Sequence, residues 1–198
     1  MNVLLIDNGD SFTYNIYSLV SKLGYSCRVL PIEDFEACKE NFSWDTAILG
    51  PGPGSPRDRP ELIKFIHNYC YKKPILGICL GHQAIGYYFG SEIVNAMSPF
   101  HGKVSKLEFT PPFGVLLKRL KLQTNFETEK RYVTRYHSLI LDKVPRKFEI
   151  LAFSNDDQSI QIMKHLELPL WGIQFHPESI LTLKGDDYLD VFFASSKI

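Results

Sequence analysis

The chain has 198 residues, of which 44% are hydrophobic and 22% are charged, a composition that is ordinary for a globular protein. Lys plus Arg and Asp plus Glu each number 22, so the formal net charge is zero and there is no basic excess for a nucleic-acid backbone or a membrane surface. No apolar run approaches the ~18 residues of a membrane span, and the N-terminus becomes charged too early for a signal peptide. The four cysteines match neither a zinc site nor a CxxC pair. We therefore expect a cytoplasmic protein whose partners are proteins and small molecules.

The first half of the chain alternates between predicted strands and predicted helices. Val3–Ile6 is a continuous apolar run followed by a loop, which is typical of a buried parallel strand. Apolar residues then recur at helical spacing from Phe12 to Leu23, and Gly24 is the stop signal. Further strands are expected at Cys27–Leu30, Thr46–Leu49 and Pro74–Ile78, and further helices at Pro60–Tyr69 and Gly81–Phe89. This alternation predicts an α/β fold with an open, mostly parallel, doubly wound sheet flanked by helices.

The second half of the chain has a different pattern, with many strands and few helices. Its strand-like segments are Val104–Phe109, Arg131–Tyr136, Phe148–Phe153, Ile160–Met163 and Leu170–Phe175. They predict an additional antiparallel sheet in the C-terminal half. Thr110–Lys130 has mixed signals and remains unassigned, whereas Asp186–Ala194 is expected to form a final helix. No segment resembles a linker, so we predict a single domain over residues 1–198.

The sharpest local motif is Gly77-Ile78-Cys79-Leu80-Gly81, which lies between an apolar strand and a helical segment. It is a nucleophile elbow with cysteine in place of serine, and its glycines allow a tight turn that side chains would block. The turn exposes the Cys79 thiol at the carboxyl end of a strand and at a helix N-terminus, whose partial positive charge favours a thiolate. The alternative is a thiol that is merely buried in the core.

A cysteine nucleophile needs a base, and His176 is the best placed of the six histidines. It closes the apolar run Leu170–Phe175, at the carboxyl end of a predicted strand. Glu178 follows two residues later and can accept a hydrogen bond from one imidazole nitrogen, which would leave the other nitrogen facing the thiol. The alternative is a loop histidine beside a solvated glutamate.

The loop Gly50–Pro56 follows the third predicted strand and is built from alternating glycine and proline. Prolines fix the backbone and glycines let it turn, so such a loop can hold one N–H toward a ligand. We expect the backbone N–H groups of Gly52 and Leu80 to form an oxyanion hole. The alternative is an ordinary surface turn. The loop does not match a phosphate-binding GxxxxGK[ST] pattern.

At these residues the sequence resembles the class I (triad-type) glutamine amidotransferases. Gly77-Ile78-Cys79-Leu80-Gly81-His82-Gln83 and His176-Pro177-Glu178-Ser179 are similar to the two signatures of that family. Further segments are similar to one branch of it, the small subunits of anthranilate synthase and of aminodeoxychorismate synthase. These segments are Asp7-Asn8, Asp10–Asn15, His101–Lys103, Arg135-Tyr136-His137-Ser138-Leu139 and Ile180-Leu181-Thr182. The resemblance runs from Asn2 to about Phe193.

The resemblance implies a catalytic role for each matching residue. Cys79 is the nucleophile, His176 the base and Glu178 the residue that orients the base. The segments that contact the substrate, L-glutamine, match Gly52, Pro53, Gly54, Gln83, Ser138 and Leu139. No metal or organic cofactor is implied. Ammonia would pass to a chorismate-binding synthase subunit, either anthranilate synthase component I or aminodeoxychorismate synthase component I.

Other segments match the surface that the resemblance assigns to the partner subunit. His101–Lys103 and Asp10–Asn15 fall into this class. Gly9 replaces a bulky residue, often tyrosine, that is usual in the family. Gly114–Tyr132 is unlike the family pattern and is expected to be a variable surface loop.

Three alternatives to this function stay open at the level of sequence. A glutaminase subunit for carbamoyl-phosphate or guanylate synthesis would share the chemistry, although the N-terminal motif and Arg135–Leu139 argue against it. A catalytically silent regulatory module on the same fold is opposed by the complete set of Cys79, His176 and Glu178. A free-standing cysteine hydrolase could act on another amide or γ-glutamyl peptide. The motifs leave the choice between anthranilate and aminodeoxychorismate open.

Overall fold

The first half of the chain forms the parallel part of a large sheet. The computed structural model describes residues 1–122 and 131–196. The strands of this half are β1 (Asn2–Asp7), β2 (Ser26–Pro31), β3 (Thr46–Leu49) and β4 (Ile75–Ile78). These parallel strands follow the order β2, β1, β3, β4 across the sheet. The helices are α1 (Thr13–Lys22), α2 (Phe35–Cys38), α3 (Pro60–Tyr69) and α4 (Leu80–Tyr88), with short 3-10 helices at Ile32–Asp34, Lys39–Asn41 and Pro56–Asp58.

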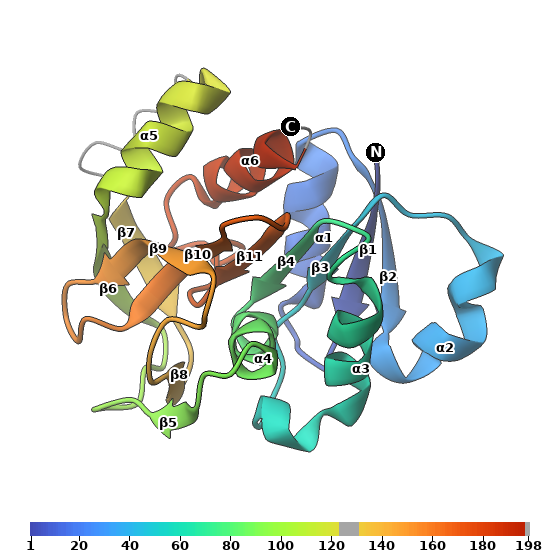
Figure 1. The fold of residues 1–198 in the computed structure, drawn as a ribbon, viewed down its shortest axis with the longest axis horizontal. Helices are drawn as coiled ribbons and strands as arrows, with labels where there is room; N and C mark the ends of the chain where they lie inside the picture. The colour runs from blue at the N-terminus through green and yellow to red at the C-terminus, as the bar shows by residue number, and fades with distance from the viewer. Residues whose placement is uncertain (123–130, 197–198) are drawn as a thin grey trace.

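The second half continues the same sheet with antiparallel strands (Figure 1). The elements of this half are β5 (Ile93–Asn95), β6 (Lys103–Phe109), α5 (Pro111–Leu120), β7 (Tyr132–Arg135), β8 (Leu139–Leu141), β9 (Phe148–Ser154), β10 (Ile160–His165), β11 (Leu170–Ile173) and α6 (Gly185–Ser195). β11 is parallel to β4, and the sheet continues beyond β11 in the order β10, β9, β6, β7 through antiparallel pairings. β5 and β8 pair separately. The predicted fold class is confirmed, and most of the antiparallel strands extend the parallel sheet rather than form a second one.

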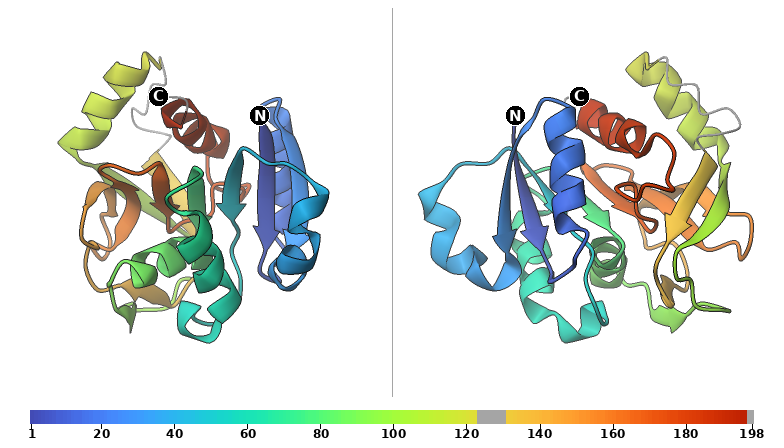
Figure 2. Two further views of the ribbon diagram at one scale, coloured as in Figure 1. Left: turned by 45° about the vertical axis from the view of Figure 1, so that its right-hand side comes forward. Right: turned by 180° about the vertical axis from the view of Figure 1, so that it is seen from behind.

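Helices cover both faces of the sheet, and the apolar strands explain why. Val3 and Leu5 of β1 pack in one core cluster with residues of α1, α5 and α6. Leu4 and Ile6 point the other way, into a cluster with residues of α2, α3 and α4. Successive side chains of a strand alternate between faces, so a continuous apolar run is buried on both sides. The two layers are visible in opposite views, with α3 and α4 on one side of the sheet and α1 and α6 on the other (Figure 2).

Strands β4 and β11 lie next to each other at the centre of the sheet. They are parallel, with Gly77 opposite Gly172 and Ile78 opposite Ile173. Their carboxyl ends therefore meet at one edge of the sheet, where open α/β sheets bind ligands. Cys79 follows β4 directly, and His176 comes three residues after the end of β11. The topology thus brings together two motifs that lie almost one hundred residues apart in the sequence.

One helix and part of one predicted loop differ from the sequence expectation. The segment Thr110–Lys130, for which the sequence patterns predict no secondary structure, contains α5, whose first two positions are Pro111 and Pro112. Proline suits the first turn of a helix, where N–H groups have no partner within the helix. The surface loop expected over 114–132 is wrong for residues 114–120, which belong to α5, and for Tyr132, which begins β7. Residues 123–130 lie outside the described residues.

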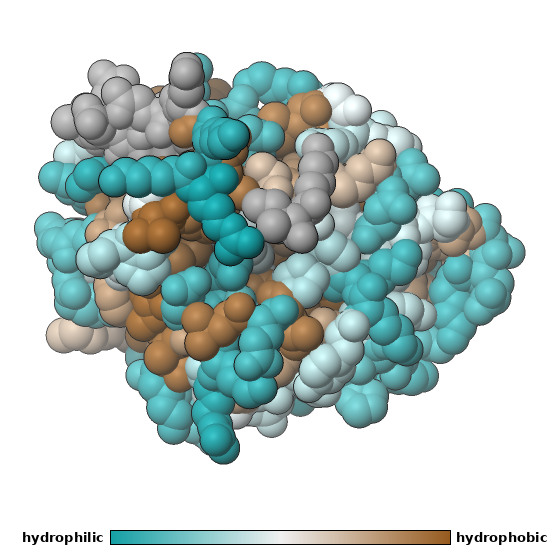
Figure 3. Space-filling model, turned by 45° about the horizontal axis from the view of Figure 1, so that its top comes forward, coloured by the Kyte–Doolittle hydropathy of each residue, from teal (hydrophilic) through white to brown (hydrophobic). Residues whose placement is uncertain are grey.

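The surface around α5 and α6 is mixed in character. Hydrophobic side chains there form separate areas, interrupted by long hydrophilic side chains (Figure 3). Within residues 1–122 and 131–196, no helix has the length and apolar character to cross a membrane.

Candidate active site

Cys79 stands in the strained turn that the glycine pattern predicts. Its backbone has φ 51° and ψ −101°, a positive φ that non-glycine residues adopt rarely and mostly where the surroundings impose it. The N–H of Cys79 donates to the Ile173 carbonyl at 2.8 Å, which ties the turn to β11. A Cβ on Gly77 would overlap the backbone of Gly81, and a Cβ on Gly81 would overlap the Leu49 carbonyl. Both glycines are therefore required by close backbone contacts, as expected for an elbow.

His176 and Glu178 form a tight buried pair beside this turn. The two atoms Nδ1 of His176 and Oε1 of Glu178 are 2.6 Å apart, and the residues are only 2% and 7% exposed. Burial on its own lowers the pKa of His176, but the neighbouring Cys79 and Glu178 outweigh it and raise that pKa well above its usual value. Nε2 makes no conventional hydrogen bond among the described residues, so the ring offers that nitrogen to the thiol.

The His176 ring is held by contacts that the sequence motifs alone do not predict. Tyr136 packs edge-on against it with ring centroids 5.3 Å apart, and Phe12 does so at 5.9 Å. The backbone N–H of His176 donates to the Thr134 carbonyl at 2.9 Å, and its carbonyl accepts from Thr182 Oγ1 at 2.7 Å. These contacts restrict the ring to one orientation relative to the nucleophile.

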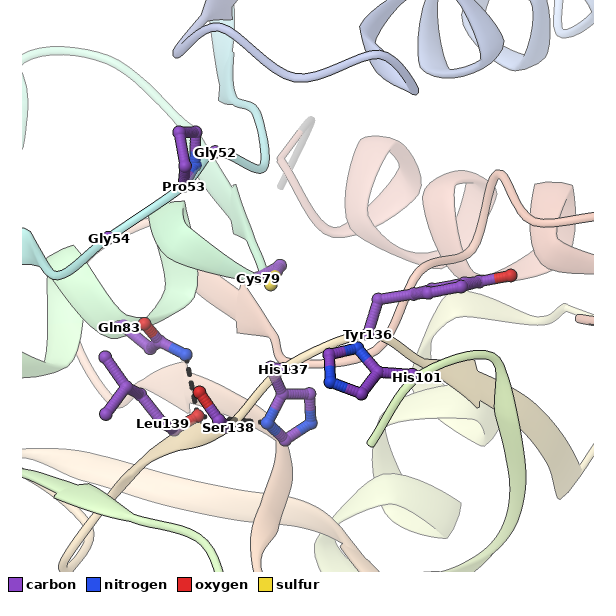
Figure 4. A pocket seen from close by; sticks show the side chains of 10 residues that line it. All are labelled: Gly52, Pro53, Gly54, Cys79, Gln83, His101, Tyr136, His137, Ser138 and Leu139. Atoms are coloured by element: carbon purple, nitrogen blue, oxygen red, sulfur yellow. Dashed lines mark hydrogen bonds between the residues drawn. The ribbon is translucent and has the colours of Figure 1, made fainter. Parts of the chain in front are cut away.

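A cavity of about 160 Å³ opens beside Cys79 (Figure 4). The residues around it come from the glycine-proline loop, the elbow, α4, the segment between β5 and β6, and the segment from the end of β7 to the start of β8. Its lining is Gly52, Pro53, Gly54, Cys79, Gln83, His101, Tyr136, His137, Ser138 and Leu139. All six residues predicted to contact glutamine are therefore brought together around one cavity with the predicted nucleophile.

The two predicted oxyanion donors lie on adjoining backbone segments. Leu80 is the first residue of α4, a position whose N–H has no partner within the helix. Gly52 packs so closely that a Cβ there would lie 2.8 Å from the Leu80 side chain and 2.7 Å from Asn8 Cβ. Asn8 in turn donates from Nδ2 to the Gly50 carbonyl at 2.8 Å, which anchors the loop. The Gly52 loop therefore packs directly against the start of α4, and the shared oxyanion role of the two N–H groups stays a prediction.

Gln174 is a buried polar residue of the site that the sequence motifs missed. Its Nε2 lies 3.8 Å from Cys79 Sγ, and its Oε1 accepts from Gln83 Nε2 at 3.2 Å. The available signal was a single glutamine inside the apolar run before His176. A buried amide needs hydrogen-bond partners, so its presence there indicates a polar site next to the strand.

The cysteines and possible metal ligands of the described part of the chain also bear on the chemistry of the site. All four cysteines are free. In residues 1–122 and 131–196, no group of three or more His, Cys, Asp or Glu side chains is arranged to hold a metal ion. A cysteine on an elbow, beside a buried histidine–glutamate pair on an α/β sheet, is the arrangement of a hydrolase that forms an acyl-thiol intermediate.

Comparison with known proteins places this arrangement in a family. The family described as Glutamine amidotransferase class-I matches residues 4–196. The chain is 40% identical over 191 residues to anthranilate synthase component 2 of Saccharolobus solfataricus, covering 92% of each chain. It is 39% identical over 196 residues to aminodeoxychorismate synthase component 2 of Serratia marcescens, covering 96% of this chain and 98% of the relative. The chain therefore belongs to the class-I glutamine amidotransferases.

A solved structure supports the fold independently. A putative GMP synthase protein of Thermoplasma acidophilum superposes with a TM-score of 0.79 at 24% identity. The match covers 100% of this chain and 95% of that one. At this identity the likeness concerns the fold alone.

Proposed function

We propose that residues 1–198 form one glutaminase domain that hydrolyses L-glutamine and delivers ammonia to a chorismate-using synthase subunit. The observation that carries the proposal is the cavity beside Cys79, which gathers every residue predicted to contact glutamine. The buried His176–Glu178 pair supplies the base next to the same thiol. Family membership supports the reaction class.

The proposed reaction uses the geometry in two steps. The Cys79 thiolate attacks the side-chain amide carbon of glutamine, and the N–H groups of Gly52 and Leu80 stabilise the oxyanion that forms. The C–N bond then breaks, and His176 gives its proton to the departing ammonia. In the second step His176 accepts a proton from water, which hydrolyses the γ-glutamyl thioester and releases glutamate and the free thiol. Glu178 holds the imidazole in orientation throughout.

The proposed partner is component I of anthranilate synthase or of aminodeoxychorismate synthase. Support comes from the names of the two curated relatives, both called component 2. The segment after the triad supports a protein partner, since Ile180 is 93% exposed and Leu181 49% exposed directly beyond Glu178. Tyr14, in the Asp10–Asn15 segment that the resemblance assigns to the partner surface, is 66% exposed.

A product assay tests this proposal and separates the two pathways. The chain, glutamine and chorismate are mixed with either type of synthase subunit, and the amine formed is identified by chromatography. Anthranilate, aminodeoxychorismate or both would identify the partner. Cys79→Ala should abolish glutamine-dependent product and leave ammonia-dependent product intact. If neither amine formed from glutamine while ammonium salts supported both synthases, the chorismate assignment would be wrong.

A further inference from the structure

The structure contains a fully buried cation next to the glutamine cavity but outside its lining. Arg135, at the end of β7, is 0% exposed, and its Nη2 lies 2.8 Å from Asp157 Oδ2. Nη1 donates to Ser154 Oγ and Nη2 to Ser159 Oγ, each at 3.0 Å. The guanidinium carbon lies 3.5 Å from the centroid of the Phe100 ring. Asp157 and the serines thus hold the two terminal nitrogens and leave Nε for another partner.

The remaining donor, Nε of Arg135, determines which ring nitrogen carries the proton in His137, a residue that lines the cavity. Nε of Arg135 is 3.0 Å from Nε2 of His137. A guanidinium can only donate, so Nε2 must accept and the proton of the neutral ring must reside on Nδ1. Nδ1 is 3.0 Å from the Leu139 carbonyl oxygen, which can only accept. Burial and the neighbouring guanidinium lower the pKa of His137 to about 3, so the ring stays neutral at physiological pH.

Hydrogen bonds through two glutamine side chains connect the Leu139 carbonyl with the nucleophile, Cys79. The Leu139 carbonyl also accepts from Nε2 of Gln83 at 2.8 Å, which fixes the Gln83 amide with its NH₂ group toward Leu139 (Figure 4). The second hydrogen of that NH₂ group is directed to Gln174 Oε1, 3.2 Å away. Gln174 must then present its own NH₂ group to Cys79 Sγ, at 3.8 Å. The guanidinium thus determines the tautomer of His137, and the Leu139 carbonyl, which can only accept, determines the orientations of Gln83 and Gln174.

We propose that Arg135 and His137 are positioning residues for the cavity that binds glutamine. Arg135 selects the Nδ1-protonated form of His137, and His137 then holds the Leu139 carbonyl together with Gln83. The backbone of Ser138 and Leu139 and the Gln83 side chain, which line the cavity, are thereby kept in the arrangement that accepts the substrate. A purely structural ion pair would be complete with Asp157 and the serines. This inference rests on the proposed glutaminase function and deepens it.

A matched pair of variants tests the donor to Leu139. In His137→Asn the side-chain amide reaches the place of Nδ1 and keeps a donor for the Leu139 carbonyl. In His137→Gln the amide reaches the place of Nε2, where it can accept from Arg135 but leaves the carbonyl without its donor. We expect His137→Gln to raise the KM for glutamine about 5- to 10-fold, the loss of one buried hydrogen bond, with a smaller change in kcat. His137→Asn, which keeps the donor to Leu139, should raise the KM by less, about 2-fold.

The assay is run on the complex with the synthase, so that failure of the inference can be told from failure of the proposed function. Ammonia-dependent product formation bypasses the cavity and reports whether each variant folds and assembles. A wild-type complex that uses ammonia but not glutamine would refute the glutaminase function itself. If wild type uses glutamine and the two variants share one KM, whether normal or raised, the positioning role is refuted.

An independent measurement determines which ring nitrogen of His137 carries the proton. In protein labelled with ¹⁵N-histidine, NMR of His137 should show protonated Nδ1 and unprotonated Nε2 between about pH 5 and pH 8. Arg135→Lys keeps a cation near Asp157 but removes the Nε donor. The preference for the Nδ1-protonated form then depends on the Leu139 carbonyl alone, so the variant should show a weaker preference and a KM increase smaller than that of His137→Gln. An Nε2-protonated ring in wild type would overturn the inference.

Discussion

The buried pair of Arg135 and Asp157 makes a quantitative prediction about stability. The atoms are 2.8 Å apart, and the side chains are 0% and 6% exposed, so solvent cannot compensate either charge after the other is lost. Asp157→Ala leaves the guanidinium buried and should cost about 3–5 kcal/mol of unfolding free energy. For a chain of this size the loss corresponds to a fall in Tm of about 6–20 °C.

Calorimetry on the variant and on a matched control checks this prediction. Lys147 and Glu167 form a pair of nearly equal length, 2.9 Å, but their side chains are 61% and 65% exposed. Glu167→Ala should therefore leave Tm nearly unchanged, because exposed ion pairs contribute little. Equal shifts in the two variants would refute the argument that burial determines the cost.

The same pair predicts an acid-side dependence of stability. Burial would raise the pKa of Asp157, but hydrogen bonds from Arg135 and Ser159 outweigh it, and the folded-state pKa lies below its usual value. Because the pKa of Asp157 is lower in the folded state, its ion pair with Arg135 stabilises the fold fully at pH values above the unfolded-state pKa of about 3.9. This stabilisation is lost as the pH falls through the folded-state pKa. The Tm difference between wild type and Asp157→Ala should therefore shrink below about pH 4.

Three further predictions concern catalysis. Glu178→Gln should lower kcat/KM for glutamine on the order of 10³–10⁴-fold. It should also move the alkaline limb of the pH profile to lower pH, because the lost carboxylate helps to raise the pKa of His176. An alkaline limb at the wild-type pH would contradict this explanation. Gly52→Ala places a Cβ 2.7 Å from Asn8 Cβ, so the loop must shift and kcat should fall about 10²–10³-fold; wild-type kcat would exclude an oxyanion role. Gln174→Leu removes the amide that faces the thiol and should lower kcat about 10-fold in a glutaminase assay. An unchanged kcat would show that the 3.8 Å contact between Gln174 Nε2 and Cys79 Sγ does not contribute to catalysis.

Much of the fold follows from local patterns. Thr46–Leu49 and Pro60–Tyr69 match the predicted bounds because apolar runs and an initial proline are local signals. The local patterns miss helix α5 because its apolar residues follow two prolines, which also occur in loops. Strands β5 and β8 have three residues each, too few for a period to be recognised.

The site is predictable only in part. The elbow around Cys79 has a local cause, since its glycines avoid backbone overlap within a few residues. The link from Arg135 through His137 to Gln83 depends on contacts between β7, the segment before β8 and α4. No pattern in the sequence encodes such side-chain contacts across the fold. A buried charge inside a strand was the available signal, because it requires a partner that the sequence leaves unnamed.

Covalent labelling of the nucleophile tests the central claim most directly. The complex with the synthase is treated with a diazoketone analogue of glutamine, and the adduct is mapped by peptide mass spectrometry. The account predicts one adduct, on Cys79, that glutamine prevents, and no adduct on Cys27, Cys38 or Cys70, which lie outside the cavity lining. Labelling of another cysteine with Cys79 unmodified, or labelling that glutamine does not slow, would contradict it.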